Sequence, residues 1–115
     1  MFRPVGRFEF EKIQAAGFRA FPPRLPEQPI FYPVTSVEYA RQIARDWNTR
    51  GAESGHVGIV LQFRVPEEVA AKYPVRTVGN REHAELWVPA EELEALNASI
   101  VGLIEVVEIW WERVE

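Results

Sequence analysis

The sequence predicts a single α+β domain over residues 1–115, in which two to three helices pack on a short-stranded, mixed or split, mostly antiparallel sheet. Three observations support this fold class. The chain has 115 residues, of which 47% are hydrophobic and 26% charged, which is typical of one globular domain. Residues 57–65 alternate in the manner of a strand, and helical spacings separate this stretch from further short strand signals near both termini.

The N-terminal region predicts a short strand followed by a helix. Phe2–Val5 has strand character, and Pro4 indicates either an edge strand or a strand start, because proline offers no N–H to a sheet ladder. Residues 8–16 carry apolar side chains at a helical spacing. Gly17 is the expected stop, since glycine readily adopts the left-handed conformation that ends helices.

Residues 21–35 form a stiff segment that contains five prolines in fifteen positions. Prolines fix φ and reduce the entropy lost on folding, so such a segment holds one extended shape without a hydrogen-bonded partner. We expect it to form one wall of a nucleotide cleft, with Arg24, Glu27, Gln28 and Tyr32 facing a ligand. The alternative is a stiff cover that protects a sheet edge from other chains.

A capped helix is predicted directly after this segment. Thr35 and Glu38 have the spacing of a capping box, in which each side chain accepts a hydrogen bond from the other residue's backbone N–H. One apolar stripe follows, and the helix should end near Asn48, before Gly51. The strand over residues 57–65 comes next, with its odd-numbered side chains on one face.

The last third of the chain predicts short elements. A strand over 75–78 is closed by a turn at Gly79-Asn80, and a second strand covers 83–88. Pro89 fits the first position of a helix, and a final strand runs from 103 to 114. We expect the four tryptophans to pack in the core. They are Trp47, Trp87, Trp110 and Trp111.

Composition and charge exclude several classes of function. The net charge is −4, but residues 1–50 carry +3 and residues 82–115 carry −8. The basic half either presents arginines to a phosphate-bearing ligand or pairs with the acidic half. An acidic chain argues against general nucleic-acid binding. With no cysteine and two histidines, we expect no metal site. No apolar run has the length of a membrane span and the first residues lack a signal peptide, so we expect a cytoplasmic protein without a membrane partner.

Four polar residues lie where simple surface positions are not expected. Arg3 is inside the first strand, and Tyr32 and Tyr39 bracket the junction between the proline-rich segment and the capped helix. Glu85 opens an apolar strand that leads into a helix. The alternatives are a surface cation for Arg3, packing for the two tyrosines and a solvent-facing position for Glu85.

Several segments resemble a family of small bacterial proteins labelled "ADP-ribosylation/crystallin J1". They are "FRPVG", "AFPPRLPEQPIFYPV", "YARQIARDWN", "VGNREHAELWVPAEELEALN" and "IVGLIEVVE". The order of elements is also similar to ADP-ribosyltransferase-like folds, which include diphtheria toxin relatives and RNA 2′-phosphotransferases. In that layout a first strand carries Arg or His, an aromatic strand leads into a helix, and a late strand begins with Glu.

The resemblance implies a site for NAD as substrate, without a metal. Arg3 would bind the ribose or phosphate side, Tyr39 or Tyr32 would stack on the nicotinamide ring, and Thr35 would lie at the helix start beside them. Glu85 would bond the ribose 2′-hydroxyl and stabilise an oxocarbenium-like transition state.

A non-catalytic protein on the same fold, which uses the cleft for a nucleotide-like ligand or a partner protein, is the alternative. Geometry separates the two hypotheses, because the enzyme requires Arg3, Tyr39 and Glu85 to converge on one cleft.

Overall fold

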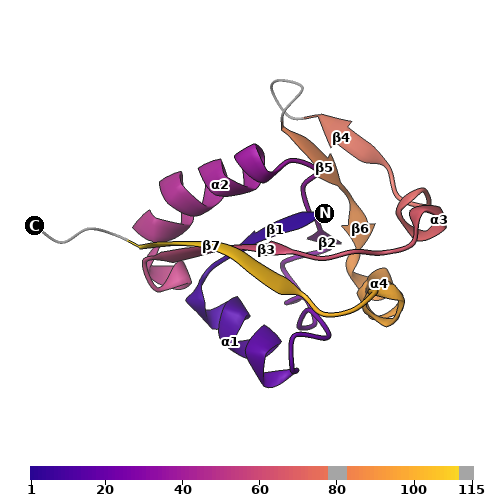
Figure 1. Ribbon diagram of the computed structural model, residues 1–115, viewed down its shortest axis with the longest axis horizontal. Coiled ribbons are helices and arrows are strands. Elements are labelled where there is room, and N and C mark those ends of the chain that lie inside the picture. The colour runs from indigo at the N-terminus through magenta and orange to yellow at the C-terminus, as the bar shows by residue number, and fades with distance from the viewer. Residues whose placement is uncertain (78–82, 112–115) are drawn as a thin grey trace, which may run out of the picture.

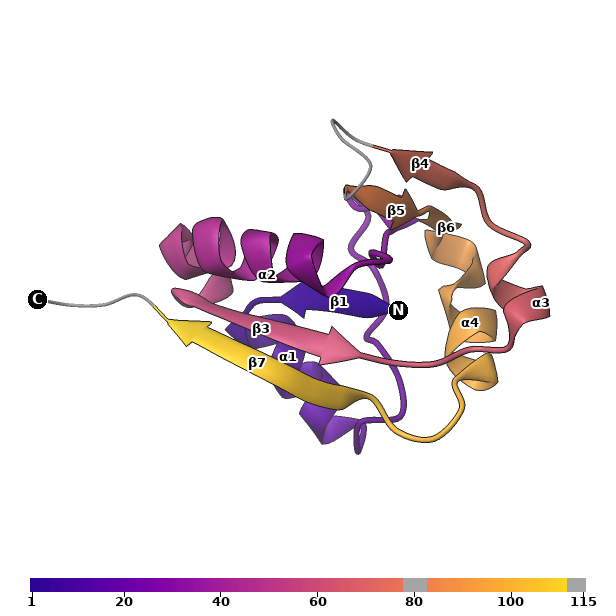
Figure 2. The same cartoon turned by 45° about the horizontal axis from the view of Figure 1, so that its top comes forward.

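A three-stranded antiparallel sheet lies between two helices in the computed structural model, which describes residues 1–77 and 83–111 (Figure 1). Helix α2 covers one face of this sheet and α1 the other (Figure 2). The strands are β1 (Phe2–Val5), β2 (Ile30–Phe31), β3 (Val57–Gln62), β4 (Val75–Thr77), β5 (Ala84–Leu86), β6 (Val88–Pro89) and β7 (Glu105–Trp111). The helices are α1 (Arg7–Ala15), α2 (Val37–Asp46), α3 (Glu67–Ala70) and α4 (Leu93–Ser99).

Strand β3 is the centre of the sheet, with β1 and β7 as its neighbours. Its alternation is that of a strand covered on both faces. Ile59 and Leu61 join the large core with α1, whereas Val60 packs under α2. Gly58 lets α2 approach closely, because a Cβ there would lie 2.2 Å from the backbone oxygen of Ala44.

Two small antiparallel pairs, β2–β6 and β4–β5, complete the strands. Val34 connects the parts, since it forms an antiparallel bridge to Phe2 on one side and to Glu85 on the other. All named pairs are antiparallel and the helices are distributed around them, so the predicted α+β fold of one compact domain is confirmed.

Three buried aromatic rings from distant parts of the sequence meet in the large core. The ring of Phe21 lies 4.9 Å, centroid to centroid, from both Phe31 and Phe63. The two ends of the proline-rich segment are therefore fixed against the sheet, while the prolines between them need few hydrogen bonds of their own.

The predicted stop of α1 is confirmed. Gly17 has φ +68°, its N–H donates to the carbonyl of Gln14 and the N–H of Phe18 donates to that of Ile13. These two hydrogen bonds form a Schellman motif, which satisfies carbonyls at the end of the helix.

The start of α2 differs from the prediction. Ser36 is the N-cap, and its hydroxyl accepts a hydrogen bond from the N–H of Tyr39 at 3.1 Å. The N–H of Thr35 instead donates to the carbonyl of Ala84, so Thr35 still belongs to the extended segment beside β5. The predicted capping box of Thr35 and Glu38 is therefore wrong, because the N-cap lies one residue later, at Ser36.

Other differences concern the C-terminal elements. Pro89 is extended and pairs with Ile30, so α4 begins only at Leu93, after a short turn. The one-turn helix α3 was not predicted, which brings the described α-helices to four. The last strand, predicted over residues 103–114, corresponds to β7 and is described only to Trp111. The predicted Gly79-Asn80 turn lies outside the described residues.

The expected core position of the tryptophans is wrong for three of the four. Trp47 is 73% exposed and Trp111 is 65% exposed, and Trp87 also reaches solvent. Aliphatic side chains fill the two clusters on the faces of the sheet, together with Phe21, Phe31, Phe63 and Tyr73. Trp110 packs at the margin of one of them.

The cap of α2 gives a direct test of the helix start. Ser36→Ala should lower the free energy of unfolding by about 0.5–2 kcal/mol, because the N–H of Tyr39 loses its acceptor. Thr35→Ala is the matched control and should change stability far less. Denaturant melts of the two variants measure the difference, and the reverse order would place the cap at Thr35.

Candidate ligand-binding cavity

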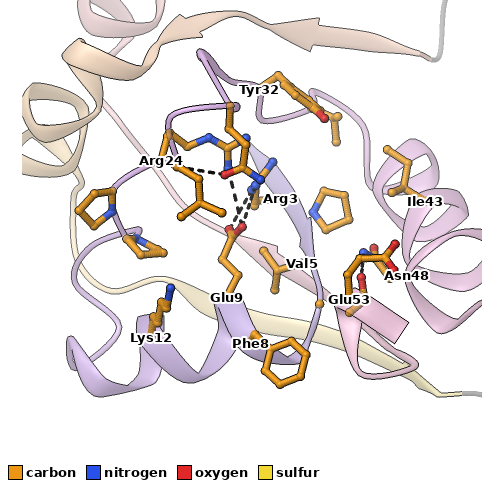
Figure 3. A pocket seen from close by; sticks show the side chains of 18 residues that line it. Arg3, Val5, Phe8, Glu9, Lys12, Arg24, Tyr32, Ile43, Asn48 and Glu53 are labelled. Atoms are coloured by element: carbon orange, nitrogen blue, oxygen red, sulfur yellow. Dashed lines mark hydrogen bonds and ion pairs between the residues drawn. The ribbon is translucent and has the colours of Figure 1, made fainter. Parts of the chain in front are cut away.

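A cavity of about 410 Å³ lies at the outer edge of β1 (Figure 3). Its walls come from β1, the first turns of α1, the proline-rich segment, α2 and the turns that follow α2. Four residues predicted to bind a ligand line it, namely Arg3, Arg24, Gln28 and Tyr32. The proline-rich segment therefore forms a wall of this cavity, with Pro22 and Pro23 also in the lining. Glu27, which was expected to face a ligand as well, is exposed and outside the lining.

The edge of β1 is closed at one end and open at the other. The backbone of Phe2 exchanges both of its hydrogen bonds with Val34, at 2.9 and 2.8 Å. Two residues later, on the same edge, Pro4 has no N–H that would require a partner. The cavity occupies this open half of the edge, so the proline-rich segment acts as an edge cover only at Val34.

Arg3 forms a bidentate ion pair inside the cavity. Its Nε and Nη2 atoms donate to the two carboxylate oxygens of Glu9, at 3.1 and 2.9 Å. The side chain of Arg3 is 9% exposed, and its guanidinium carbon lies 4.8 Å from the ring centroid of Phe31. A surface position for Arg3 is thereby excluded.

A second buried guanidinium shares the same carboxylate. The side chain of Arg24 is also 9% exposed, and its Nη1 atom lies 3.9 Å from a carboxylate oxygen of Glu9. Its Nη2 atom donates to the carbonyl of Ile30, whereas its buried Nε atom has no hydrogen-bond partner in the described part of the chain. Burial, followed by the positive charge of Arg3, holds the pKa of Arg24 below its ordinary value.

The lining as a whole carries an excess of positive charge. Its cations are Arg3, Arg24 and Lys12, and its anions are Glu9 and Glu53, so the balance is +1. A buried charge without full compensation is costly, and an anion would offset that cost.

The rim of the cavity is aromatic. Phe8 and Tyr32 line it and are 52% and 42% exposed. The ring centroid of Tyr32 lies 5.7 Å from the guanidinium carbon of Arg3. Figure 3 shows Tyr32 on one side of the arginine pair and Phe8 on the opposite side, at the start of α1.

Tyr39 and Glu85 form a separate pair outside this lining. The phenol of Tyr39 donates to one carboxylate oxygen of Glu85 at 2.6 Å, and the indole of Trp87 donates to the other at 3.1 Å. The ring of Tyr39 stacks on His83, with centroids 4.4 Å apart. Burial, followed by the hydrogen bond to Glu85, raises the pKa of Tyr39 well above its ordinary value, so its phenol remains a donor at neutral pH.

The ladder explains why these two groups of residues are separate. Phe2, Val34 and Glu85 lie opposite one another and direct their side chains to the α2 face. Arg3 is one residue later than Phe2, so its side chain leaves on the other face. Tyr32 belongs to the cavity group, since it lines the cavity and its ring centroid lies 5.7 Å from the guanidinium carbon of Arg3.

The remaining predicted residues divide in the same way. Gln28 lines the cavity and uses its carbonyl oxygen to accept from the N–H of Leu25 at 3.2 Å. Thr35 is exposed and outside the lining. Sequence reasoning missed Glu9, although a buried arginine in a strand demands a nearby carboxylate and Glu9 lies in the first turn of the next helix.

The two halves of opposite charge meet at one ion pair among the described residues. Arg41 on α2 and Glu108 on β7 are 2.6 Å apart, while the other ion pairs lie within residues 1–50. Arg3 and Arg24 therefore take no part in the ion pair between the two halves, and both line the cavity.

Two general properties bear on what the cavity can hold. The described residues contain no group of three or more His, Asp or Glu side chains arranged to hold a metal ion. No helix in the described ranges is long and apolar enough to cross a membrane.

Comparisons with protein-family models, with curated proteins and with solved structures found no match.

The shared carboxylate gives the first prediction for this site. Glu9→Gln should destabilise the fold toward the lower end of about 3–5 kcal/mol, because it leaves two buried guanidinium groups without a countercharge. Millimolar phosphate should restore part of that loss by binding the folded state. Glu11→Gln is the matched control on the same helix, since its ion pair with Arg7 is exposed and worth about 1 kcal/mol or less. Equal losses in the two variants, measured by denaturant melts, would show that the charge cluster is not a special feature of the fold.

The raised pKa of Tyr39 gives a pH dependence. Above about pH 10 the unfolded chain releases the phenolic proton and the folded chain retains it, so stability should fall as pH rises. Tyr39→Phe removes this contribution, and its stability should fall less between pH 9 and 11 than that of the parent. Denaturant melts at several pH values measure this difference. If stability falls equally with pH in the parent and in Tyr39→Phe, the buried hydrogen bond between Tyr39 and Glu85 is contradicted.

Proposed function

We propose that this protein binds a small anionic ligand of the nucleotide class in the cavity at the edge of β1, with NAD and ADP-ribose as the first ligands to test. The buried Nε atom of Arg24 carries the proposal. It is a charged donor without a partner, held beside a second guanidinium and a single carboxylate. A phosphate oxygen is the acceptor that such a donor fits best.

The size and rim of the cavity support a nucleotide rather than a bare ion. Its volume of about 410 Å³ is within the usual range of about 300–1,000 Å³ for small-molecule sites. Phe8 and Tyr32 provide exposed rings on which a base or a nicotinamide can stack. Arg3, held by Glu9, would contribute its charge without having to be ordered on binding.

Transfer of ADP-ribose, or cleavage of NAD, is a second candidate, which requires Arg3, Tyr39 and Glu85 to converge on one cleft. That requirement is not met, because Arg3 lines the cavity whereas Tyr39 and Glu85 lie outside its lining. The carboxylate of Glu85 is held instead by two donors, Tyr39 and Trp87. Each oxygen of this carboxylate keeps a lone pair that could accept from a ribose hydroxyl, but the carboxylate is not in the cavity where Arg3 and Arg24 would hold the phosphates. We therefore favour binding over catalysis as the function of this chain.

Calorimetric titration with NAD, ADP-ribose and inorganic phosphate tests the binding proposal. Arg24→Met should abolish binding of all three, because the unpartnered donor is removed. The same variant should keep its stability or gain some, since it replaces an excess buried charge with an apolar chain of similar length. Arg45→Met is the control, since Arg45 pairs with Asp46 on the surface and lies outside the cavity lining. If none of the three ligands binds the parent at millimolar concentration, the proposal is wrong.

Incubation of the parent with NAD separates the two candidates. Turnover that falls by about two to three orders of magnitude in Glu85→Gln, with NAD affinity unchanged, would establish catalysis. Binding without turnover in the parent is the result that we expect for a binding protein.

A further inference from the structure

The outer edge of β7 is a second feature of the molecule, unrelated to the cavity. Strand β7 is hydrogen-bonded to β3 on one side, and no described strand lies on its other side. Figure 2 shows β7 as the outermost strand of the three-stranded sheet. An unpaired edge of seven residues is unusual, because it offers backbone donors and acceptors to other chains.

The same strand exposes apolar side chains. Ile109 is 50% exposed, Trp111 is 65% exposed and Val107 is 40% exposed. Ile109 lies opposite Ile59, which is only 4% exposed. The core that covers this face of the sheet therefore buries β3 but leaves β7 exposed. A contiguous apolar edge of this kind in a folded protein commonly marks an interface.

A bulge limits the part of the edge that can pair. The register between β3 and β7 skips Val107, where the partner residues change from Val60–Glu108 to Leu61–Val106. Bulges twist an edge strand and discourage pairing next to them. From Glu108 to Trp111 the ladder is regular, so the usable edge is the C-terminal half of β7.

The charges on this half fit a second copy of the same chain. In an antiparallel pair centred on Ile109, that residue faces itself and Glu108 faces Trp110 of the second copy. No carboxylate of this half of the strand therefore lies opposite another. Glu108 is also already neutralised by Arg41, at 2.6 Å. Because the exposed stripe carries no charge, it has no feature that would select a basic or an acidic partner over itself.

We propose that β7 pairs antiparallel with β7 of a second copy, about a two-fold axis at Ile109, to give a dimer with one continuous six-stranded sheet. Two-fold dimers are the commonest oligomers of soluble proteins, and their interfaces must be self-complementary in this way. The pairing satisfies backbone groups in the C-terminal half of the edge and covers Ile109.

Sedimentation velocity over a range of protein concentrations tests the proposal. The parent should sediment as a dimer of two 13.2 kDa chains at high concentration, and added salt should not dissociate it, because the apolar contact is opposed only by repulsion between protomers of charge −4. Ile109→Lys should be monomeric throughout, since it places two like charges opposite each other. Val75→Lys, on the exposed edge pair β4–β5, is the control and should dimerise as the parent does. A monomeric parent would overturn the proposal, as would an Ile109→Lys variant that still dimerises.

The register has its own test, because the chain has no cysteine. Opposite residues in an antiparallel pair have Cβ atoms about 4.5–5.5 Å apart. Ile109→Cys should therefore give a covalent dimer with a short bifunctional thiol reagent, and Val75→Cys should not. Equal cross-linking of the two variants would contradict the axis at Ile109.

Discussion

The position of Val34 between Phe2 and Glu85 is the constraint on which the rest of the molecule depends. This one residue closes half of the β1 edge and attaches β5 to the main sheet. It also fixes where the extended segment ends and α2 begins. The open half of the β1 edge becomes the cavity, and Glu85 is brought onto the face where Tyr39 can reach it.

The lining of the cavity buries more positive than negative charge, which is unfavourable in a protein interior. Two guanidinium groups with 9% exposure share a single carboxylate, and one of their nitrogens has no partner among the described atoms. The ring of Phe31 lies near both guanidinium carbons, at 4.8 and 5.8 Å, and offsets part of the cost. Buried charge without full compensation lowers the stability of the fold, and this supports the proposed binding of a charged ligand.

Local signals in the sequence were sufficient for most of the fold. Pro4 was compatible with the edge position of β1, Gly17 marked the end of α1 and alternation marked β3 as a strand, because each signal depends on a few adjacent residues. The central position of β3 depends on pairing with β1 and β7, which are distant in sequence. The cap of α2 was missed because the N–H of Thr35 is held by Ala84, a contact between residues far apart in sequence. For the same reason the exposure of Trp47 and Trp111 could not be read from their apolar character.

The site was only partly predictable. Arg24, Gln28 and Tyr32 were expected in one cleft because they lie in the proline-rich segment, and Arg3 because of the resemblance in the order of elements; all four line one cavity. Glu85 was expected to join Arg3, but the alternation of side chains across the Phe2–Val34–Glu85 ladder separates them. That separation depends on strand pairing, which no local pattern specifies.

The arginine Nε–Hε resonances of the ¹⁵N-labelled protein, followed during titration with ADP-ribose, test the central claim most directly. Arg24→Met assigns the signal of interest by its loss. We predict a saturable shift of the Arg24 signal, because its Nε–H acquires a phosphate acceptor, with little change for the exposed Arg45. An Arg24 signal that remains in place while ADP-ribose binds elsewhere, or does not bind at all, would contradict the account.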